Sequence, residues 1–173
     1  MKRLLSKFPI SKPGFSLLEV ITVLFIISIG MIGTMSLIVQ NIQTEQANRG
    51  NLIACQLAQE GLELIRKTRD NNWLVPQDWL TDLSDGTYKM DYSMATPTSI
   101  TTIDEGVLLL ENGFYRHYAP AEGENVNLET DFYRVLTLQS LSEVSEQVQS
   151  AVTWSNRGRE YNCTLMTILY DWR

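Results

Sequence analysis

The feature that most constrains this chain is one uninterrupted apolar segment near its N-terminus. It runs for 25 residues, from Phe15 to Val39, and reads FSLLEVITVLFIISIGMIGTMSLIV. A helix rising 1.5 Å per residue would make this segment about 37 Å long, which exceeds the roughly 30 Å hydrocarbon core of a bilayer. The rest of the 173 residues holds no second segment of this kind. The sequence therefore predicts one membrane stem and one modest folded domain.

The residues before the apolar segment are basic. They include four cations and no acid: Lys2, Arg3, Lys7 and Lys12. The positive-inside rule places such a leader in the cytoplasm and predicts that everything after Val39 is exported. A secretory signal would end in a small-x-small cleavage site, and QNIQTEQANRG after Val39 offers none. The segment is then either a plain membrane anchor or something more specialised.

Glu19 separates these two interpretations. A carboxylate inside an apolar helix costs about 2.5–3.5 kcal/mol at the bilayer centre and less near the interface, and a plain anchor does not need one. The simplest explanation is a shallow glutamate that the headgroup region tolerates. The alternative is that the carboxylate has a function that requires it at this position.

The junction of leader and apolar segment, K-P-G followed by F-S-L-L-E, resembles the prepilin leader of type IV pilins and pseudopilins. The resemblance implies that a prepilin peptidase cuts after Gly14 and methylates the new amine of Phe15. It also implies that Glu19 pairs with the amine of a neighbouring subunit during assembly. The helix macrodipole favours a carboxylate in the first turns, which agrees with this assignment. The leader of fourteen residues is longer than in many members of the family.

One departure from many major pilins is that the apolar segment contains no proline. Gly30 and Gly33 lie in its second half, where each costs the helix about 1 kcal/mol relative to alanine. They could loosen the helix, or their G-x-x-G spacing could simply allow two helices to approach closely. Both interpretations concern packing, and the sequence leaves both open.

The pattern after Val39 remains helical, with small and apolar residues recurring at steps of three, four and seven. The stretch ACQLAQEGLELIRKTRDNNW resembles the corresponding stretch of minor pilins and pseudopilins. The basic residues, Asp70 and the two asparagines of RKTRDNNW are helix-ending signals, so we expect the stem helix to end near Thr68 to Asp70.

The last hundred residues predict β structure. Asn112-Gly113 and Asn156-Arg157-Gly158 are turn signals between strand-like arms, and the turn-rich DLSDG precedes YKMDYSMA. An antiparallel sheet with one apolar face could pack on the exposed half of the stem helix. The expected fold class is therefore α+β, the pilin fold. The expected parts are a leader (1–14), a membrane or filament-core helix (15–39), a stem helix (40–70) and a β-rich domain (71–173).

Charge and cysteine content restrict the possible partners. The net charge is −6, and removal of the four leader cations would leave about −10, which argues against a surface for nucleic acid. A small basic patch at Arg157 and Arg159 is the exception to this acidity. Cys55 and Cys163 lack the spacing of a zinc or redox site, so they form either one disulfide or two free buried thiols.

The sequence contains no recognisable catalytic or metal-binding set. The single histidine, His117, is expected at the surface or half-buried in a strand. Asp82 and Asp85 only faintly resemble a calcium loop, and turn chemistry explains them. We therefore expect no cofactor, no metal and no enzyme activity. Two or three of the four tryptophans, Trp73, Trp79, Trp154 and Trp172, are expected in the core.

These observations predict a structural subunit of a type IV pilus-type filament, of a minor rather than abundant kind. The expected partners are other pilin subunits, the prepilin peptidase and methyltransferase, and an assembly platform in the membrane. Before assembly the chain would be a single-pass membrane protein with its domain outside, and afterwards part of an extracellular filament. The alternatives are a pseudopilin of a type II secretion or DNA-uptake machine, or a plain membrane-anchored binding module.

Overall fold

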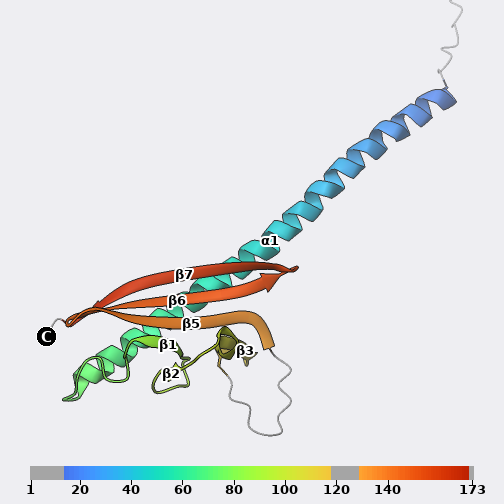
Figure 1. The fold of residues 1–173 in the computed structure, drawn as a ribbon. Helices are drawn as coiled ribbons and strands as arrows, with labels where there is room; N and C mark the ends of the chain where they lie inside the picture. The colour runs from blue at the N-terminus through green and yellow to red at the C-terminus, as the bar shows by residue number, and fades with distance from the viewer. Residues whose placement is uncertain (1–13, 118–128, 172–173) are drawn as a thin grey trace, which may run out of the picture. The chain divides into compact units, whose positions relative to one another are not determined.

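The computed structural model describes residues 14–117 and 129–171. It divides into two units, Met1–Glu45 and Gln46–Arg173. The helix α1 extends over Leu17–Leu74, and the elements after it are mostly strands (Figure 1). One long apolar helix followed by an antiparallel sheet confirms the α+β fold class.

The helix extends past the end that the sequence predicted. Residues 71–74 remain helical because the polar residues there have tertiary partners. The Asn72 side-chain amide donates hydrogen bonds to the carbonyls of Trp79 and Thr81, at 3.1 and 2.7 Å. The Arg69 guanidinium lies 4.4 Å from the ring centre of Trp73, which is itself buried. Side chains that favour a helix end in isolation therefore stabilise the last turn in this fold.

Within the described residues the sheet has seven strands, and all of the pairs between them are antiparallel. The longest strand, β5 (Glu129–Ser142), pairs on one side with β6 (Ser145–Asn156) and on the other with β1 (Gly86–Lys89) and β3 (Val107–Glu111). Further out lie β2 (Thr98–Ser99), β4 (Phe114–Arg116) and β7 (Arg159–Tyr170). A single 3-10 turn, η1 (Ile103–Gly106), precedes β3.

Both predicted hairpins are present. Asn112 and Gly113 have φ values of 52° and 86°, and they join β3 to β4 through the pair Glu111 and Phe114. Arg157 and Gly158 have φ values of 54° and 74°, and they join β6 to β7. Positive φ at both central residues is what a two-residue hairpin of type I′ requires.

The strand expected across YKMDYSMA is shorter than predicted. It ends at Lys89, and the next two residues leave the sheet and become buried. The carbonyl of Met90 accepts a hydrogen bond of 2.6 Å from the buried guanidinium of Arg134. The chain turns at Asp91, whose carboxylate accepts hydrogen bonds from the backbone N–H and the hydroxyl of Ser93. A buried charge therefore interrupts the period-two pattern at this point.

In the second unit, the part of α1 after Gln46 packs on the inner face of the sheet. One core cluster joins Ala54 and Ala58 to Val152 and Trp154, and the other joins Ile65 and further helix residues to the opposite end of β6. This part of the helix therefore runs alongside β6 in the opposite direction. Trp73, Trp79 and Trp154 are all buried, as expected for most of the tryptophans, and Trp172 lies outside the described residues.

Gly61 lies at a point of close approach between helix and sheet. A Cβ atom there would lie 2.6 Å from the Ser150 hydroxyl oxygen and 2.7 Å from a methyl carbon of Leu136. These distances are shorter than a van der Waals contact, so only glycine fits without movement.

Cys55 on α1 and Cys163 on β7 form a disulfide, with their Cα atoms 5.4 Å apart. Of the two alternatives that the sequence left open, the structure contains the bridge. It links the first and last elements of the second unit across 108 residues of sequence.

Candidate processing and assembly site

The helix α1 begins immediately after the predicted processing point. The Ser16 carbonyl accepts hydrogen bonds from the backbone N–H groups of Glu19 and Val20, at 3.0 and 3.2 Å, and the helix is assigned from Leu17. Glu19 is the acid of the first turn. Its carboxylate therefore lies where unsatisfied N–H groups and the positive end of the macrodipole stabilise a negative charge.

The bond between Gly14 and Phe15 lies outside the helix. Gly14 has no atom within 4 Å of the position that a Cβ would occupy, and the Phe15 side chain is 83% exposed. A peptidase acts on accessible, non-helical backbone, and this bond satisfies both requirements. Cleavage here would leave Phe15 with a charged amine, two residues before the first helical residue.

Phe15, Glu19 and Val23 lie four residues apart, on one face near the start of α1. Together with Val20 and Leu24 they line one shallow hollow. Apart from Glu19, the residues that line this hollow are all apolar. A second helix packed against this face could bring a cation to Glu19 while apolar contacts exclude water.

Three hydroxyl groups within the apolar segment bond to the backbone of their own helix. Ser28 donates to the Leu24 carbonyl at 2.7 Å and Thr34 donates to the Met31 carbonyl at 2.9 Å, while Thr22 bonds to the Leu18 carbonyl. Each donor is thus satisfied without water or a partner chain. This is the arrangement that a helix surrounded by lipid or by other apolar helices requires.

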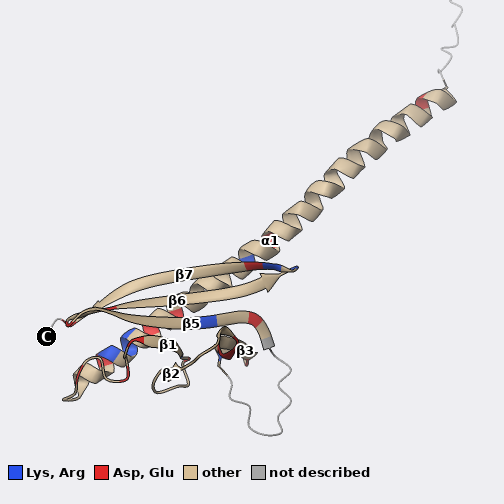
Figure 2. Ribbon diagram, in the orientation of Figure 1, with Lys and Arg blue, Asp and Glu red and all other residues tan. Residues whose placement is uncertain are grey.

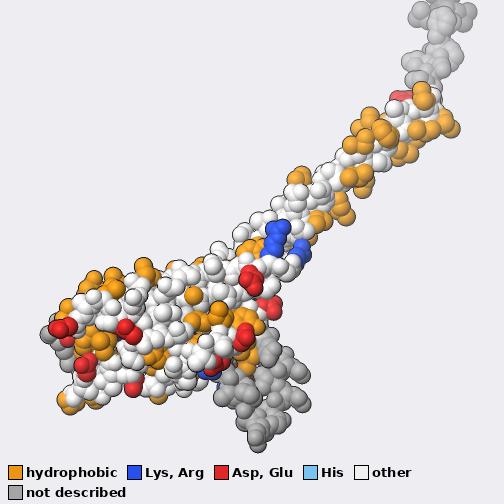
Figure 3. All heavy atoms as spheres, in the orientation of Figure 1, with side chains coloured by type: hydrophobic (Ala, Val, Ile, Leu, Met, Phe, Trp, Pro, Cys, Tyr) orange, Lys and Arg blue, Asp and Glu red, His pale blue; other side chains and the backbone are white. Residues whose placement is uncertain are grey.

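The described residues of the first unit expose their apolar side chains. Every residue from Phe15 to Glu45 is exposed, Ile32 for example to 72%. Figure 3 shows hydrophobic side chains, in orange, along this part of the helix. The most apolar 18-residue window of α1 has a mean hydropathy of 2.3, long and apolar enough to cross a membrane. In Figure 2 this part of the helix carries almost no charge. A surface of this size needs a lipid or protein environment.

A comparison with known protein families identifies the sequence motif at the start of this helix. Residues 11–35 match the family model of the prokaryotic N-terminal methylation motif. Residues 11–35 carry the type IV pilin and pseudopilin leader. No curated protein and no solved structure matches the chain. The leader supports a pilin-like precursor that a prepilin peptidase processes and that assembles with other pilins, and it indicates a structural subunit and not an enzyme.

The match to the pilin leader covers the residues on which the sequence resemblance rested. Gly14, Phe15 and Glu19 all lie inside it, and the apolar helix that follows supports membrane anchoring before assembly into a pilus. The structure adds that these three residues lie at the beginning of α1. Their roles in cleavage, methylation and assembly remain predictions.

The sequence reasoning missed a buried ionic cluster in the second unit. Arg134 is fully buried, and its guanidinium donates to the Leu57 carbonyl of α1 at 3.0 Å and to the Met90 carbonyl at 2.6 Å. The Glu60 carboxylate lies 3.3 Å from the same guanidinium. Burial lowers the pKa of Arg134, and Glu60 and Asp91 act against this shift. The arginine therefore joins helix, sheet and loop at one point.

Asp91 and His117 lie beside this arginine. Asp91 is fully buried and accepts hydrogen bonds from the backbone N–H groups of Ser93 and His117, at 2.8 and 2.6 Å. Burial acts to raise the pKa of Asp91, but these bonds and that of the Ser93 hydroxyl together lower it. The expectation that His117 lies at the surface or half-buried in a strand is wrong. It is buried just after the end of β4, where its backbone N–H donates a hydrogen bond to the buried carboxylate of Asp91.

Burial also lowers the pKa of His117 to about 4, and nearby Arg134 adds to this shift. The imidazole is therefore neutral at pH 7, with its Nδ1 3.0 Å from the Val107 carbonyl. Among residues 14–117 and 129–171, no group of three or more His, Cys, Asp or Glu side chains is placed to hold a metal ion. Asp82 has φ of 64°, as expected for turn chemistry, and Asp85 accepts a 2.7 Å hydrogen bond from the Ser140 N–H.

Glu146 is a second buried charge that the sequence did not suggest. It lies on the inner face of β6, is 1% exposed, and its Oε1 has no hydrogen-bond partner among the described residues. Burial raises the pKa of Glu146 to about 7, and the Asp85 carboxylate adds to the shift. The side chain therefore lies where a neutral carboxyl group is favoured over a carboxylate.

We expect Glu146→Gln to remove a pH dependence of stability. Because the folded pKa of about 7 exceeds the unfolded value near 4.5, folding stability falls as the pH rises between these values. The full loss, at most about 3 kcal/mol, is reached above pH 7. The variant should therefore unfold at higher urea than the wild type at pH 8 and at the same urea at pH 4. Glu143→Gln, an exposed neighbour, serves as the control and should change neither value. Equal gains at both pH values would contradict this assignment.

Proposed function

We propose that this chain is a minor subunit of a type IV pilus-type filament, stored in the membrane through residues 15–39 and assembled through the same helix. The observation that carries the proposal is the pilin leader at residues 11–35, joined to a helix whose side chains from 15 to 45 are all exposed. The helix can be surrounded by lipid during storage and by neighbouring helices in a filament.

The proposed topology follows from charge. The four leader cations hold residues 1–14 in the cytoplasm, and the β-rich domain lies on the other side of the membrane. An oxidising compartment there would suit the disulfide between Cys55 and Cys163. The proposed partners are other pilin subunits, the prepilin peptidase and methyltransferase, and a membrane assembly platform. After assembly the domain would be part of an extracellular filament.

The proposed assembly step depends on Glu19. Cleavage after Gly14 gives Phe15 a positive amine, and the Glu19 carboxylate of one subunit pairs with the amine of its neighbour. A buried ion pair adds little net stability, but a misaligned pair leaves a charge unpaired at a cost of several kcal/mol. Because the apolar surfaces of two such helices could pack in many registers, the ion pair would select one of them.

The minor-subunit assignment is favoured over the abundant one by the absence of a proline between Phe15 and Val39, and by the stem's resemblance to minor pilins and pseudopilins. A pseudopilin of a type II secretion or DNA-uptake machine would have the same leader and helix. A plain membrane-anchored module would differ from both, because it would keep residues 1–14 in its mature form.

The test combines N-terminal mass with assembly in the native cells. Wild-type protein from membranes and from sheared filaments should begin at Phe15, with or without a methyl group. Glu19→Ala should still be cut, because the bond lies before the helix, but should be reduced at least tenfold in the filament fraction. Loss of one buried, aligned ion pair justifies a factor of this order.

Glu45→Ala is the matched control, because Glu45 is the only other acid between the leader and Gly50 and is exposed. It should be processed and assembled like the wild type. A mature chain that retains residues 1–14 would leave only the plain anchor. Correct cleavage together with unchanged assembly of Glu19→Ala would keep the pilin pathway and reject the role of Glu19.

A further inference from the structure

The strand β7 forms a long free edge of the sheet. It pairs with β6 over twelve residues, from Arg159 to Tyr170, and with no other described strand. The other terminal strands of the sheet, β2 and β4, contain two and three residues. Among the described elements, β7 is therefore the one edge long enough to accept a complete additional strand (Figure 1).

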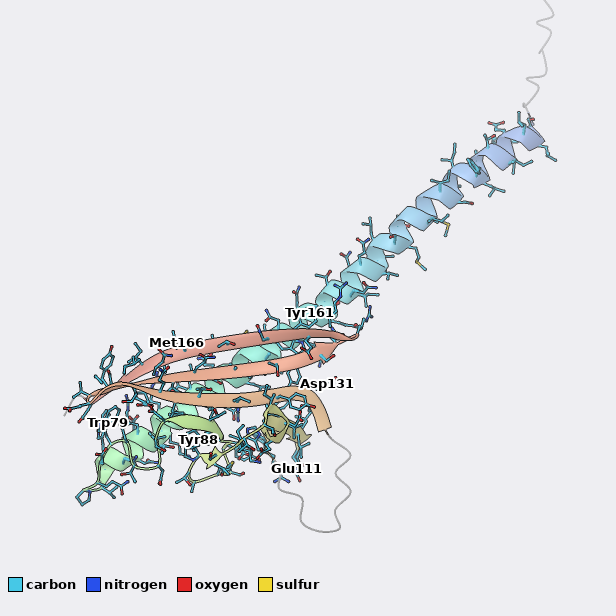
Figure 4. The ribbon with its side chains drawn as sticks, viewed as in Figure 1. Trp79, Tyr88, Glu111, Asp131, Tyr161 and Met166 are labelled. Carbon is cyan, nitrogen blue, oxygen red and sulfur yellow. A yellow bond between two sulfur atoms is a disulfide. The ribbon has the colours of Figure 1, made fainter. Side chains whose placement is uncertain are left out.

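This edge lacks the features that normally prevent pairing with another chain. From Tyr161 to Tyr170 it reads YNCTLMTILY, with no charge, no proline and no glycine, and its register with β6 has no shift. Natural edge strands are usually short, charged, bulged or covered. Met166, Ile168 and Tyr170 are 60%, 40% and 53% exposed. Figure 4 labels Met166 and Tyr161 on β7. A strand edge of this composition pairs with another strand in the native assembly or, if no strand covers it, promotes aggregation.

The register shows which backbone groups point outward. Asn156 and Arg159 close a two-residue turn, so they form a hydrogen-bonded pair, and such pairs alternate along an antiparallel ladder. The N–H and C=O groups of residues 160, 162, 164, 166, 168 and 170 therefore face away from β6. The side chains of these same residues are exposed, whereas Leu169, between two of them, is buried.

We propose that β7 pairs with β7 of a second copy of this chain, in an antiparallel arrangement centred on Leu165. In this register Thr164 faces Met166 of the other copy, and both residues present outward backbone groups. Among the antiparallel registers that oppose outward-facing residues, this one opposes all six of them, and it places Arg159 opposite Asp171 of the other copy at both ends. The residues between these two are uncharged except for Glu160, which lies opposite Tyr170 of the other copy, so the opposite charges at the two ends make β7 complementary to itself.

A second copy is favoured over other occupants by symmetry. The short edges β2 and β4 cannot pair along the length of β7, so head-to-tail addition of copies through the sheet is not available. A two-fold pair uses the same edge twice and closes on itself. The proposal depends on residues 159–171 and not on the proposed function, so either can fail without the other.

The first experiment uses the full chain in detergent micelles, with its oligomeric state measured by light scattering across a concentration series. Thr164→Pro should abolish the concentration-dependent dimer, because proline removes an outward N–H and leaves the bonds to β6 intact. Thr164→Val, which keeps the N–H and the branched side chain, should dimerise like the wild type. The thermal unfolding midpoint of each variant shows that the domain still folds.

The second experiment tests the register. Arg159→Asp and Asp171→Arg alone each place like charges opposite one another at both ends, and each should raise the dimer dissociation constant about tenfold at low salt. The double variant restores opposite charges and should recover the wild-type value. Recovery supports the antiparallel register centred on Leu165. A monomeric wild type, a dimer that persists in Thr164→Pro, or a double variant as weak as the single ones would overturn the proposal.

Discussion

Replacing Arg134 with alanine is expected to lower the free energy of unfolding of the second unit by about 3–5 kcal/mol. Removing one partner from a buried ionic cluster leaves other charged and polar groups without compensation, and this produces losses of that size. In this domain the carbonyls of Leu57 and Met90 would lose their donor, and the fully buried Asp91 would lose its favourable electrostatic interaction with the guanidinium. The variant would also leave a cavity where helix, sheet and loop meet.

The measurement is urea unfolding of the full chain in micelles, followed by the fluorescence of the buried tryptophans. Arg66→Ala is the control, because the ion pair of Arg66 with Glu63 is exposed and should contribute less than about 1 kcal/mol. Arg134→Met keeps much of the side-chain volume and should cost less than Arg134→Ala. A loss for Arg134→Ala as small as that of the control would show that the cluster is not coupled to folding.

Loss of the disulfide is expected to have an effect of similar size. The bridge between Cys55 and Cys163 closes a loop of 108 residues, which is nearly the whole second unit. In the chain-entropy model, a loop of about 100 residues restricts the unfolded state by about 4.7 kcal/mol. A variant with both Cys55→Ala and Cys163→Ala should therefore unfold with about 4–5 kcal/mol less free energy than the oxidised wild type.

Reduction of the wild type provides an independent check of this value. Wild-type protein unfolded in excess dithiothreitol should match the double variant, and dithiothreitol should not change the double variant. Each single variant should match the double variant, because one cysteine cannot form the bridge. Equal stability of oxidised and reduced wild type would contradict the entropic account.

The parts of this fold that depend on local sequence were predictable. The apolar segment is visible by length alone. The Asn112-Gly113 turn follows from the positive φ that Asn and Gly tolerate, and Gly158 marks the second turn in the same way. The leader was recognisable because its motif consists of residues that are adjacent in the sequence, and the match over residues 11–35 confirmed it.

Features that depend on long-range contacts were not predictable in the same way. The helix reaches Leu74 because Asn72 bonds to residues beyond the helix end, which a local pattern cannot show. His117 is buried because its N–H is bonded by Asp91, 26 residues earlier. Arg134 was within reach of sequence reasoning, since it alternates with the buried Leu136 and Leu138 and must share their face.

The position of the disulfide has a mechanical consequence. If tension enters the domain through α1 at Gln46 and is resisted at β7, the shortest covalent path passes from Cys55 to Cys163. Residues 56–162 lie off that path, so a pull cannot extract them from the domain while the bridge is intact. While the bridge is intact, the buried core therefore bears none of the tension. Reduction of this one bond would allow the link between α1 and β7, which is otherwise nearly inextensible, to lengthen by about a hundred residues of chain.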